Sequence, residues 1–454
     1  MLDRHSIPTL KASESGHQFV VYGDSCSGIA GALHEATFRQ VNAAIGALDR
    51  PPDFICFLGD EIMGLTTDAD ELRRQWRHFF GRELAWLDRD AIPLYHATGN
   101  HTTYDPMSDK VFRDVMRHLP IDERGGLSYF VRREDLLLVF VDTLDAGAGG
   151  EGTVDVVWLD DVLRRQSDAR YKLVFGHHPV WPVNGYAGDY QRAIERENGR
   201  RFWDALRRHD VLAYFCSHIL AFDAQVQAGI LQICTAGAAT AHRMPPEQEY
   251  LHFAQVALDE CGLRWQTLDR RGQMREWLRW PWQLPPVSDW SAFTPGAARS
   301  LPADCLQNAE TASLIVWEIN ARLAPDTNAQ PQTLLCADAE DGALAWLWLG
   351  ISGVDGRMTA LLSPQANRSP HRWLGPALPR DRRFSIQFAL HSGLGPGGLL
   401  WRWSDGDAWS SMIGASAWGV ERLPWSSSWR VGGGGLQELS LKWHRESFAL
   451  ANFL

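Results

Sequence analysis

Short apolar runs that end in polar residues constrain this chain more than any other feature of its sequence. Between residues 16 and 220, such runs end in Gly-Asp, Gly-Asn-His, Gly-His-His or Ser-His. Apolar residues recur at helical spacing over residues 32–48 and 68–87, which separate the first three runs. Strands that alternate with helices predict an α/β layered domain, and such sheets bind ligands at the carboxyl ends of their strands. We therefore expect the polar strand ends to form one site.

Five of these strand ends carry side chains that bind transition metals. In chain order they read YGDSC, LGDEI, TGNHT, FGHHPVW and CSHIL. Carboxylate, amide carbonyl and imidazole groups suit Mn, Fe or Zn. A carboxylate can bridge two ions about 3.5–4 Å apart, and such a pair activates water and clamps a phosphoryl oxygen. One turn aspartate or core histidine has an ordinary structural explanation, but five such ends in one order predict a metal centre.

These motifs resemble those of the calcineurin-like metallophosphoesterase superfamily, and within it the purple, or tartrate-resistant, acid phosphatase-like branch. The resemblance covers about residues 16–270 and is carried by GHHPVW, by the helical RFWDALRRHDVLAYFCSH and by GILQICTAGAA. It implies an α/β domain at residues 1–277, an αββα sandwich with a dinuclear centre between strand-end loops. It also implies hydrolysis of a phosphate mono- or diester by metal-activated water.

The resemblance assigns roles to six residues of the strand ends. The implied metal ligands are Asp24, Asp60, Asn100, His177 and His218. Asp60 corresponds to the bridging carboxylate, and Asp24 to a ligand of the second metal position. His101 corresponds to the histidine that contacts the phosphate and assists the leaving group, so it is the implied catalytic residue.

The chain departs from the family pattern at the second metal position. Where the family supplies a histidine or a tyrosine, this sequence has Cys26, Met63 and Leu220. A leucine coordinates nothing, and without a tyrosinate we expect no purple Fe(III)–phenolate colour. Cys26 is either a ligand that favours zinc or a small packed thiol. We therefore expect one divalent ion (Mn, Fe or Zn), with two ions as the alternative.

Two further residues and a second function stay open at this point. His178 is either a metal ligand or, more in keeping with its position, a residue that supports the ligands. Tyr186 lies in a loop where it could donate a hydrogen bond to the substrate. Because ligands are missing, the alternative function is a catalytically impaired family member that binds a phospho-ligand or a glycan.

The second part of the chain has a different composition. Five of the 21 tryptophans precede residue 260 and 16 follow it. Residues 278–303 are rich in Pro, Trp and Ser, and we interpret them as a linker. Residues 304–454 contain short strand candidates between turn residues, which predicts an all-β sandwich. Through RFSIQFALHSGLGPGGLLWRW and SSWRVGGG they resemble a laminin-G or concanavalin-like module, which implies contacts with glycans or a second copy; core or interface tryptophans are the alternative.

Charge and hydropathy argue against two classes of partner. The formal net charge is −11, which disfavours broad nucleic-acid binding. No apolar run reaches about 18 residues, so we expect no membrane span. The first ten residues lack the basic and apolar regions of a secretory signal, so we expect a cytoplasmic protein. The seven cysteines are scattered without a CxxC motif and do not suggest a disulfide framework.

Overall fold

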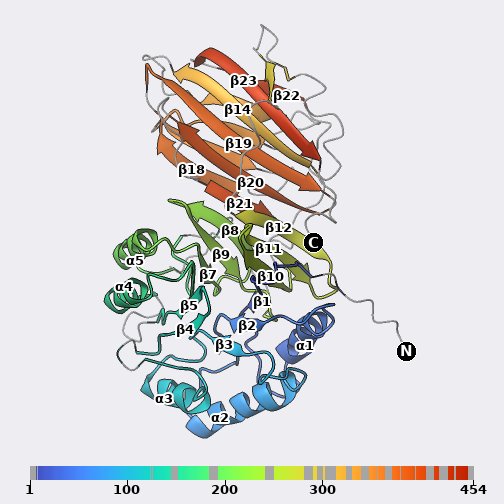
Figure 1. Ribbon diagram of the computed structural model, residues 1–454, viewed down its shortest axis with the longest axis vertical. Helices are drawn as coiled ribbons and strands as arrows, with labels where there is room; N and C mark the ends of the chain where they lie inside the picture. The colour runs from blue at the N-terminus through green and yellow to red at the C-terminus, as the bar shows by residue number, and fades with distance from the viewer. Residues whose placement is uncertain are drawn as a thin grey trace, which may run out of the picture. The chain divides into compact units, whose positions relative to one another are not determined.

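The computed structural model contains two compact units (Figure 1). One consists of residues 1–224 and 230–281, and the other of residues 225–229 and 282–453. The structure describes residues 7, 9–122, 124, 126–144, 152–181, 183, 193–240, 250–280, 290–293, 300–301, 313–323, 330–338, 347–354, 356–362, 371–378, 380–393, 395–404, 414–418, 428–433 and 436–447.

The first unit contains two six-stranded sheets, and the first of them has the order β12-β11-β10-β1-β2-β3. Its strands are β1 His17–Tyr22, β2 Phe54–Phe57, β3 Leu94–His96, β10 His252–Asp259, β11 Gly262–Asp269 and β12 Met274–Trp280. Strands β1, β2 and β3 are parallel, and β10 runs antiparallel to β1. Every residue of β1, β2 and β10 is buried, which is typical of a sheet covered on both faces.

The second sheet of this unit has the order β4-β5-β6-β7-β9-β8. Its strands are β4 Tyr129–Arg133, β5 Leu136–Phe140, β6 Tyr171–Phe175, β7 Ala213–Cys216, β8 Phe222–Gln227 and β9 Ile230–Thr235. The last three residues of β8 are counted with the other unit. Strands β5, β6, β7 and β9 are parallel. The two sheets face each other, because the rings of Phe19 and Phe215 lie 6.4 Å apart and those of Tyr95 and Phe140 lie 5.9 Å apart.

Helices cover the outer face of each sheet (Figure 1). They are α1 Leu33–Ile45, α2 Ala69–His78, the π-helix η1 Phe79–Glu83, α3 Pro106–Val115, α4 Val156–Arg165 and α5 Arg196–Arg208. Phe38 of α1 packs on Phe57 of the first sheet, and Leu159 of α4 and Leu206 of α5 share a core with the second sheet. The predicted αββα sandwich is therefore confirmed. Among the described residues, none of the helices combines the length and apolar character that a membrane crossing needs.

A capping box fixes the start of α3 directly after the loop that carries Asn100 and His101. The Asp105 carboxylate accepts a hydrogen bond from the Ser108 backbone N–H at 2.7 Å, and the Ser108 hydroxyl accepts one from the Asp105 N–H at 2.9 Å. Pro106 occupies the first helical turn, where its missing N–H costs nothing. The far end of the loop is thus anchored by local hydrogen bonds.

The second unit is all-β, as predicted, and contains two antiparallel sheets. Their orders are β13-β23-β14-β19-β20-β21 and β18-β17-β16-β15-β22. The strands are β13 Ser291–Phe293, β14 Ser313–Leu323, β15 Gln332–Ala337, β16 Leu347–Ile351, β17 Arg357–Leu362, β18 His371–Ala377, β19 Arg383–Gly393, β20 Gly395–Ser404, β21 Gly414–Trp418, β22 Trp429–Val431 and β23 Leu436–Ser447. Trp317 of β14 stacks on Trp429 of β22 at 5.5 Å, so one core joins both sheets.

The segment predicted as a linker, residues 278–303, contains strand residues. Strand β12 ends at Trp280, and Ser291 of β13 pairs with Trp443 of β23. The boundaries at residues 277 and 304 stay predictions, as does the laminin-G character of the second unit.

We expect Trp317→Ala to lower the free energy of unfolding of the second unit by about 3–5 kcal/mol, because it leaves a cavity in the shared core. Trp317 is fully buried, whereas Val354 is 95% exposed and provides the matched control. Val354→Ala should change the unfolding free energy by less than about 0.5 kcal/mol. Denaturant unfolding of the full chain measures both values, and equal stability of the two variants would contradict a single core.

Candidate metal centre

Loops at the carboxyl ends of five strands carry the six predicted site residues. Asp24 follows β1, Asp60 follows β2, Asn100 and His101 follow β3, His177 follows β6 and His218 follows β7. Three of these strands belong to the first sheet and two to the second. Because the two sheets face each other, their strand-end loops meet over one edge of the sandwich.

Four residues of these loops have a left-handed backbone conformation. Their φ angles are +63° at Asp24, +40° at Cys26, +55° at Asp60 and +67° at His218. For a residue with a side chain this conformation costs about 1–3 kcal/mol, and it is concentrated at functional sites. The four turns aim side chains that a relaxed backbone would direct elsewhere.

Gly59 explains why a glycine precedes Asp60. Its φ is +89°, and a Cβ at this position would lie 2.4 Å from the Thr98 carbonyl oxygen and 2.9 Å from His177 Nδ1. Only glycine allows the β2 and β3 loops and the His177 ring to approach this closely.

The His177 ring is the centre of the first ligand group. Its Nδ1 donates to the Leu58 carbonyl oxygen at 2.8 Å, so Nε2 is the nitrogen that faces the other ligands. His177 Nε2 lies 3.3 Å from Asp60 Oδ2, 3.1 Å from Asn100 Oδ1 and 3.0 Å from His218 Nδ1. The ligand atoms of Asp60, His177 and His218 all lie within 4.8 Å of one another. Two imidazoles with carboxylate and amide oxygens fit a divalent Mn, Fe or Zn ion.

Asp60 and His177 hold opposite charges inside the protein. Burial raises the pKa of Asp60, but the charge and hydrogen bond of His177 outweigh burial and bring that pKa to about 2. Burial conversely lowers the pKa of His177, and the Asp60 carboxylate outweighs it, so that this pKa is about 9. The His177 imidazolium thus supplies a positive charge beside the buried Asp60 carboxylate.

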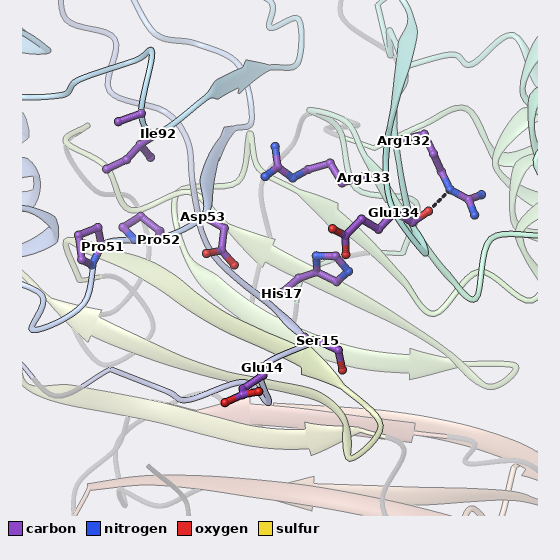
Figure 2. Close-up of a pocket in the computed structure, with 12 residues that line it drawn as sticks. Glu14, Ser15, His17, Pro51, Pro52, Asp53, Ile92, Arg132, Arg133 and Glu134 are labelled. Carbon is purple, nitrogen blue, oxygen red and sulfur yellow. Dashed lines mark hydrogen bonds between the residues drawn. The ribbon is translucent and has the colours of Figure 1, made fainter.

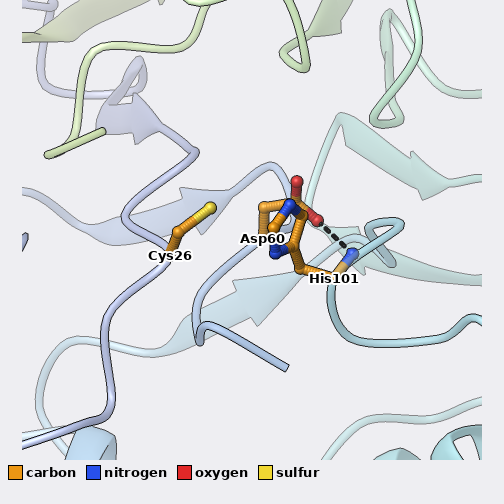
Figure 3. A group of neighbouring side chains, drawn as sticks. All are labelled: Cys26, Asp60 and His101. Carbon is orange, nitrogen blue, oxygen red and sulfur yellow. Dashed lines mark hydrogen bonds between the residues drawn. The ribbon is translucent and has the colours of Figure 1, made fainter. Parts of the chain in front are cut away.

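Asp24 and Cys26 belong to the loop after β1, where the resemblance places ligands of the second metal position. Asp24 Oδ2 accepts hydrogen bonds from the His218 N–H at 3.0 Å and from the Ser217 hydroxyl. Burial raises the pKa of Asp24 to about 7, although His177 opposes this shift. Cys26 Sγ lies within 4.8 Å of ligand atoms of both Asp60 and His101 (Figure 3).

Leu220 and Met63 add no side-chain ligand of the family type, as the sequence predicts. Leu220 is half-buried in the loop after β7. Met63 contributes through its backbone, because its carbonyl oxygen accepts a hydrogen bond from His101 Nδ1 at 2.7 Å. The backbone N–H of His101 donates to Asp60 Oδ1 at 2.8 Å. His101 is therefore oriented from two sides, and Nδ1 is the ring nitrogen that its hydrogen bond to Met63 occupies.

Two hydroxyl residues that sequence reasoning missed hold Asp24 in place. Ser217 contacts its carboxylate, and the Thr240 hydroxyl donates to its backbone carbonyl oxygen at 2.5 Å. Ser217 directly precedes His218, which is a usable signal in the CSH motif. Thr240 follows the AGAA segment and lies 216 positions from Asp24 along the chain, so no local pattern indicates it.

A buried pair that the sequence does not indicate lies next to the bridging carboxylate. Glu61 Oε1 and His96 Nδ1 are 2.8 Å apart, and both side chains are fully buried. Burial raises the pKa of Glu61 and lowers that of His96 to about 3, so burial disfavours the charged form of both groups.

His178 supports the ligands from behind. Its Nδ1 lies 3.0 Å from the Thr143 hydroxyl, and its ring centroid is 4.3 Å from that of His218. This arrangement favours the supporting role among the two left open. The prediction for Tyr186 lies outside the described residues.

A pocket at the opposite ends of the strands contains none of the predicted site residues (Figure 2). It has a volume of about 760 Å³ and is lined by the start of β1, the segment before β2 and the β4–β5 turn. Two arginines, Arg132 and Arg133, and three acidic residues, Glu14, Asp53 and Glu134, line the pocket. Arg132 Nε donates to the Glu134 carbonyl oxygen at 2.5 Å. Charges of both signs do not suggest a particular ligand.

The region that contains the site is similar to a known protein family. Residues 17–222 match the family model of the calcineurin-like phosphoesterases. A comparison with curated proteins gave no match. Among solved structures, the chain is similar to a purple acid phosphatase from yellow lupin (Lupinus luteus) seeds, with 16% identity, a TM-score of 0.44, and coverage of 58% of this chain and 53% of that chain. The matched region thus spans about half the length of the lupin protein.

Two other solved structures are also similar to this chain. One is GAP50, described as the anchor in the inner membrane complex of Plasmodium, with 13% identity, a TM-score of 0.41, and coverage of 58% of this chain and 88% of that chain. The other is a galectin from Caenorhabditis elegans, with 11% identity, a TM-score of 0.23, and coverage of 36% of this chain and 99% of that chain.

We expect Gly64→Ala to displace the His101 loop. The φ of Gly64 is +56°, and a Cβ there would lie 1.5 Å from the His101 carbonyl oxygen. The variant should lose more than about 1 kcal/mol of unfolding free energy, because a methyl group fits neither the backbone nor the space. Gly81→Ala is the control, since nothing lies within 4 Å of its Cβ position. Equal melting temperatures of the two variants would contradict the close approach of the two loops.

Proposed function

Because residues 17–222 match the family model of the calcineurin-like phosphoesterases, we propose that this protein is a metal-dependent hydrolase of phosphate mono- or diesters. The observation that carries the proposal is the convergence of Asp60, Asn100 and His218 on one imidazole nitrogen of His177. A purely structural polar cluster does not need two histidines, a carboxylate and an amide from four separate loops in one buried spot.

The described residues supply the binding functions that phosphoester hydrolysis requires. Asp60, Asn100, His177 and His218 would hold a divalent ion, and Asp24 and Asp60 would supply carboxylates to a second one. A bound ion polarises a phosphoryl oxygen and lowers the pKa of water. The protein itself orients the ligands, through the Leu58 carbonyl oxygen for His177 and through the His218 N–H for Asp24.

His101 is proposed as the proton donor to the leaving-group oxygen. The hydrogen bond from Nδ1 to the Met63 carbonyl oxygen fixes the tautomer, so that a proton on Nε2 is the one transferred. The hydrogen bond from its backbone N–H to Asp60 keeps the ring next to the bridging carboxylate. Both contacts support a catalytic role for His101 rather than a role as a metal ligand.

The alternative is a catalytically impaired protein that binds a phospho-ligand or a glycan. Met63 and Leu220 favour it, because the second position lacks the family's tyrosine and its last histidine. The retained ligand group and the oriented His101 favour hydrolysis. Residues 304–454 are predicted from the sequence alone to bind a glycan or a second copy of the chain. The cytoplasmic location is also a prediction from the sequence.

Removal of the metal tests the proposal directly. We expect dialysis against a chelator to abolish turnover of p-nitrophenyl phosphate and bis-p-nitrophenyl phosphate, and Mn, Zn or Fe to restore it. His177→Ala should lose bound metal and turnover together, because it removes the central imidazole. His209→Ala is the matched control, since its imidazole bonds Asp160 on the helical side. Full turnover by metal-free protein would contradict the proposal. No turnover with any ion would favour the alternative, a protein that binds a phospho-ligand or a glycan.

The role of His101 has its own test. We expect His101→Ala to keep its bound metal but to lower kcat by about 10²–10⁴-fold for an alkyl phosphate, whose leaving group needs a proton. The loss for p-nitrophenyl phosphate should be smaller, because p-nitrophenolate leaves without protonation. Steady-state kinetics with both substrates and metal analysis measure this difference. Equal losses for the two substrates would assign His101 to phosphate binding instead.

A further inference from the structure

The thiol of Cys26 is directed toward the bridging carboxylate. Cys26 Sγ, a carboxylate oxygen of Asp60 and a ring nitrogen of His101 all lie within 4.8 Å of one another. Figure 3 shows the Cys26 side chain pointing toward Asp60. Cys26 is 4% exposed, so this orientation is set by packing.

Backbone hydrogen bonds lock this orientation. The Cys26 N–H donates to the Asp60 carbonyl oxygen at 2.7 Å, and the Ser27 N–H donates to the Glu61 carbonyl oxygen at 3.0 Å. The φ of +40° at Cys26 is disfavoured for a cysteine and places Sγ on the side of the metal loops. The two strand-end loops are thus joined side by side at the position of the thiol.

Acidic residues of the helical layer hold the loop beyond Cys26. Both Glu83 carboxylate oxygens accept from the Gly28 N–H at 3.1 Å, and Glu35 accepts from the Gly31 N–H at 2.7 Å. His78 lies 3.0 Å from the second oxygen of Glu35. These contacts keep the loop from turning the thiol away from Asp60.

The surroundings of the thiol differ from those of a packed core cysteine. Two buried carboxylates face it, Asp24 and Asp60, and each is 2% exposed. One oxygen of Asp24 accepts hydrogen bonds from the His218 N–H and the Ser217 hydroxyl, which fixes the orientation of this carboxylate. Two carboxylates with a thiolate form a donor set that binds zinc more readily than Mg or Mn.

We propose that Cys26 is a thiolate ligand of a second divalent ion, held together with Asp24 and the bridging Asp60, and that this position selects zinc or another thiophilic ion. The inference rests on the proposed metal centre. It makes the site dinuclear despite Leu220 and Met63, because sulfur takes the place of the absent nitrogen ligands. On binding, the S–H bond breaks, a sulfur–metal bond forms and the proton passes to solvent.

Cobalt substitution of the full chain tests the proposal. Wild-type protein loaded with Co(II) should show a thiolate-to-cobalt charge-transfer band in the near ultraviolet and two ions per chain by elemental analysis. Cys26→Ala should lose the band and one of the two ions. Cys26→His, which places an imidazole at this position, should recover the second ion without the band.

Cys234→Ala is the matched control. Its thiol is fully buried, with Sγ 3.4 Å from the Ser217 carbonyl oxygen, and it is not part of the group that Cys26 forms with Asp60 and His101. The control should keep the band and both ions. If Cys26→Ala does not fold, Cys26→Ser preserves the side-chain shape and carries the same expectations.

The outcomes separate this inference from the proposed function. Bound cobalt without a thiolate band, or two ions retained in Cys26→Ala, would overturn the role of Cys26 and leave the metal centre standing. No bound cobalt in the wild-type protein would overturn both. A band that disappears in Cys234→Ala but persists in Cys26→Ala would show that Cys234, and not Cys26, supplies the thiolate. That result would overturn the inference.

Discussion

The carboxylates buried in the first unit need positive charge or hydrogen-bond donors around them, and the arrangement of the site depends on this constraint. Asp24 and Asp60 are each 2% exposed, and His177 is fully buried between them and His218. Buried carboxylates are stable only when a cation or several hydrogen-bond donors compensate them. Backbone and hydroxyl donors satisfy part of Asp24, and the imidazolium of His177 compensates Asp60. A divalent ion meets the same demand more fully, because it neutralises several oxygens at once.

The arrangement of the two sheets makes this concentration of ligands feasible. Strands β1, β2 and β3 of one sheet and β6 and β7 of the other end over the same edge of the sandwich. Each loop contributes only one or two ligands, so no single loop has to fold around an ion. Aromatic contacts between the sheets, such as Phe19 with Phe215, hold the strands that set the spacing of the loops.

The sequence predicts the parts of the site that depend on strand ends, because an apolar run and its polar end are both local patterns. Asp60, His177 and His218 are recognisable for this reason, and the structure brings them together. Cys26 left two interpretations open, since the direction of its side chain depends on pairing with the β2 loop. Thr240 and the Glu61–His96 pair depend on packing between distant segments. Strand β13 was interpreted as part of a linker because its three residues are too short for a period to be visible.

The left-handed turns at Asp24, Cys26, Asp60 and His218 also have a consequence for the dynamics of the chain. Together these turns lower the stability of the fold by several kcal/mol, since each costs about 1–3 kcal/mol. Binding of an ion to the ligand side chains would offset this cost. We therefore expect the strand-end loops to open before the buried strands beneath them when the proposed ion is withdrawn. Amide hydrogen exchange would register ion occupancy at these four turns before any change in the core.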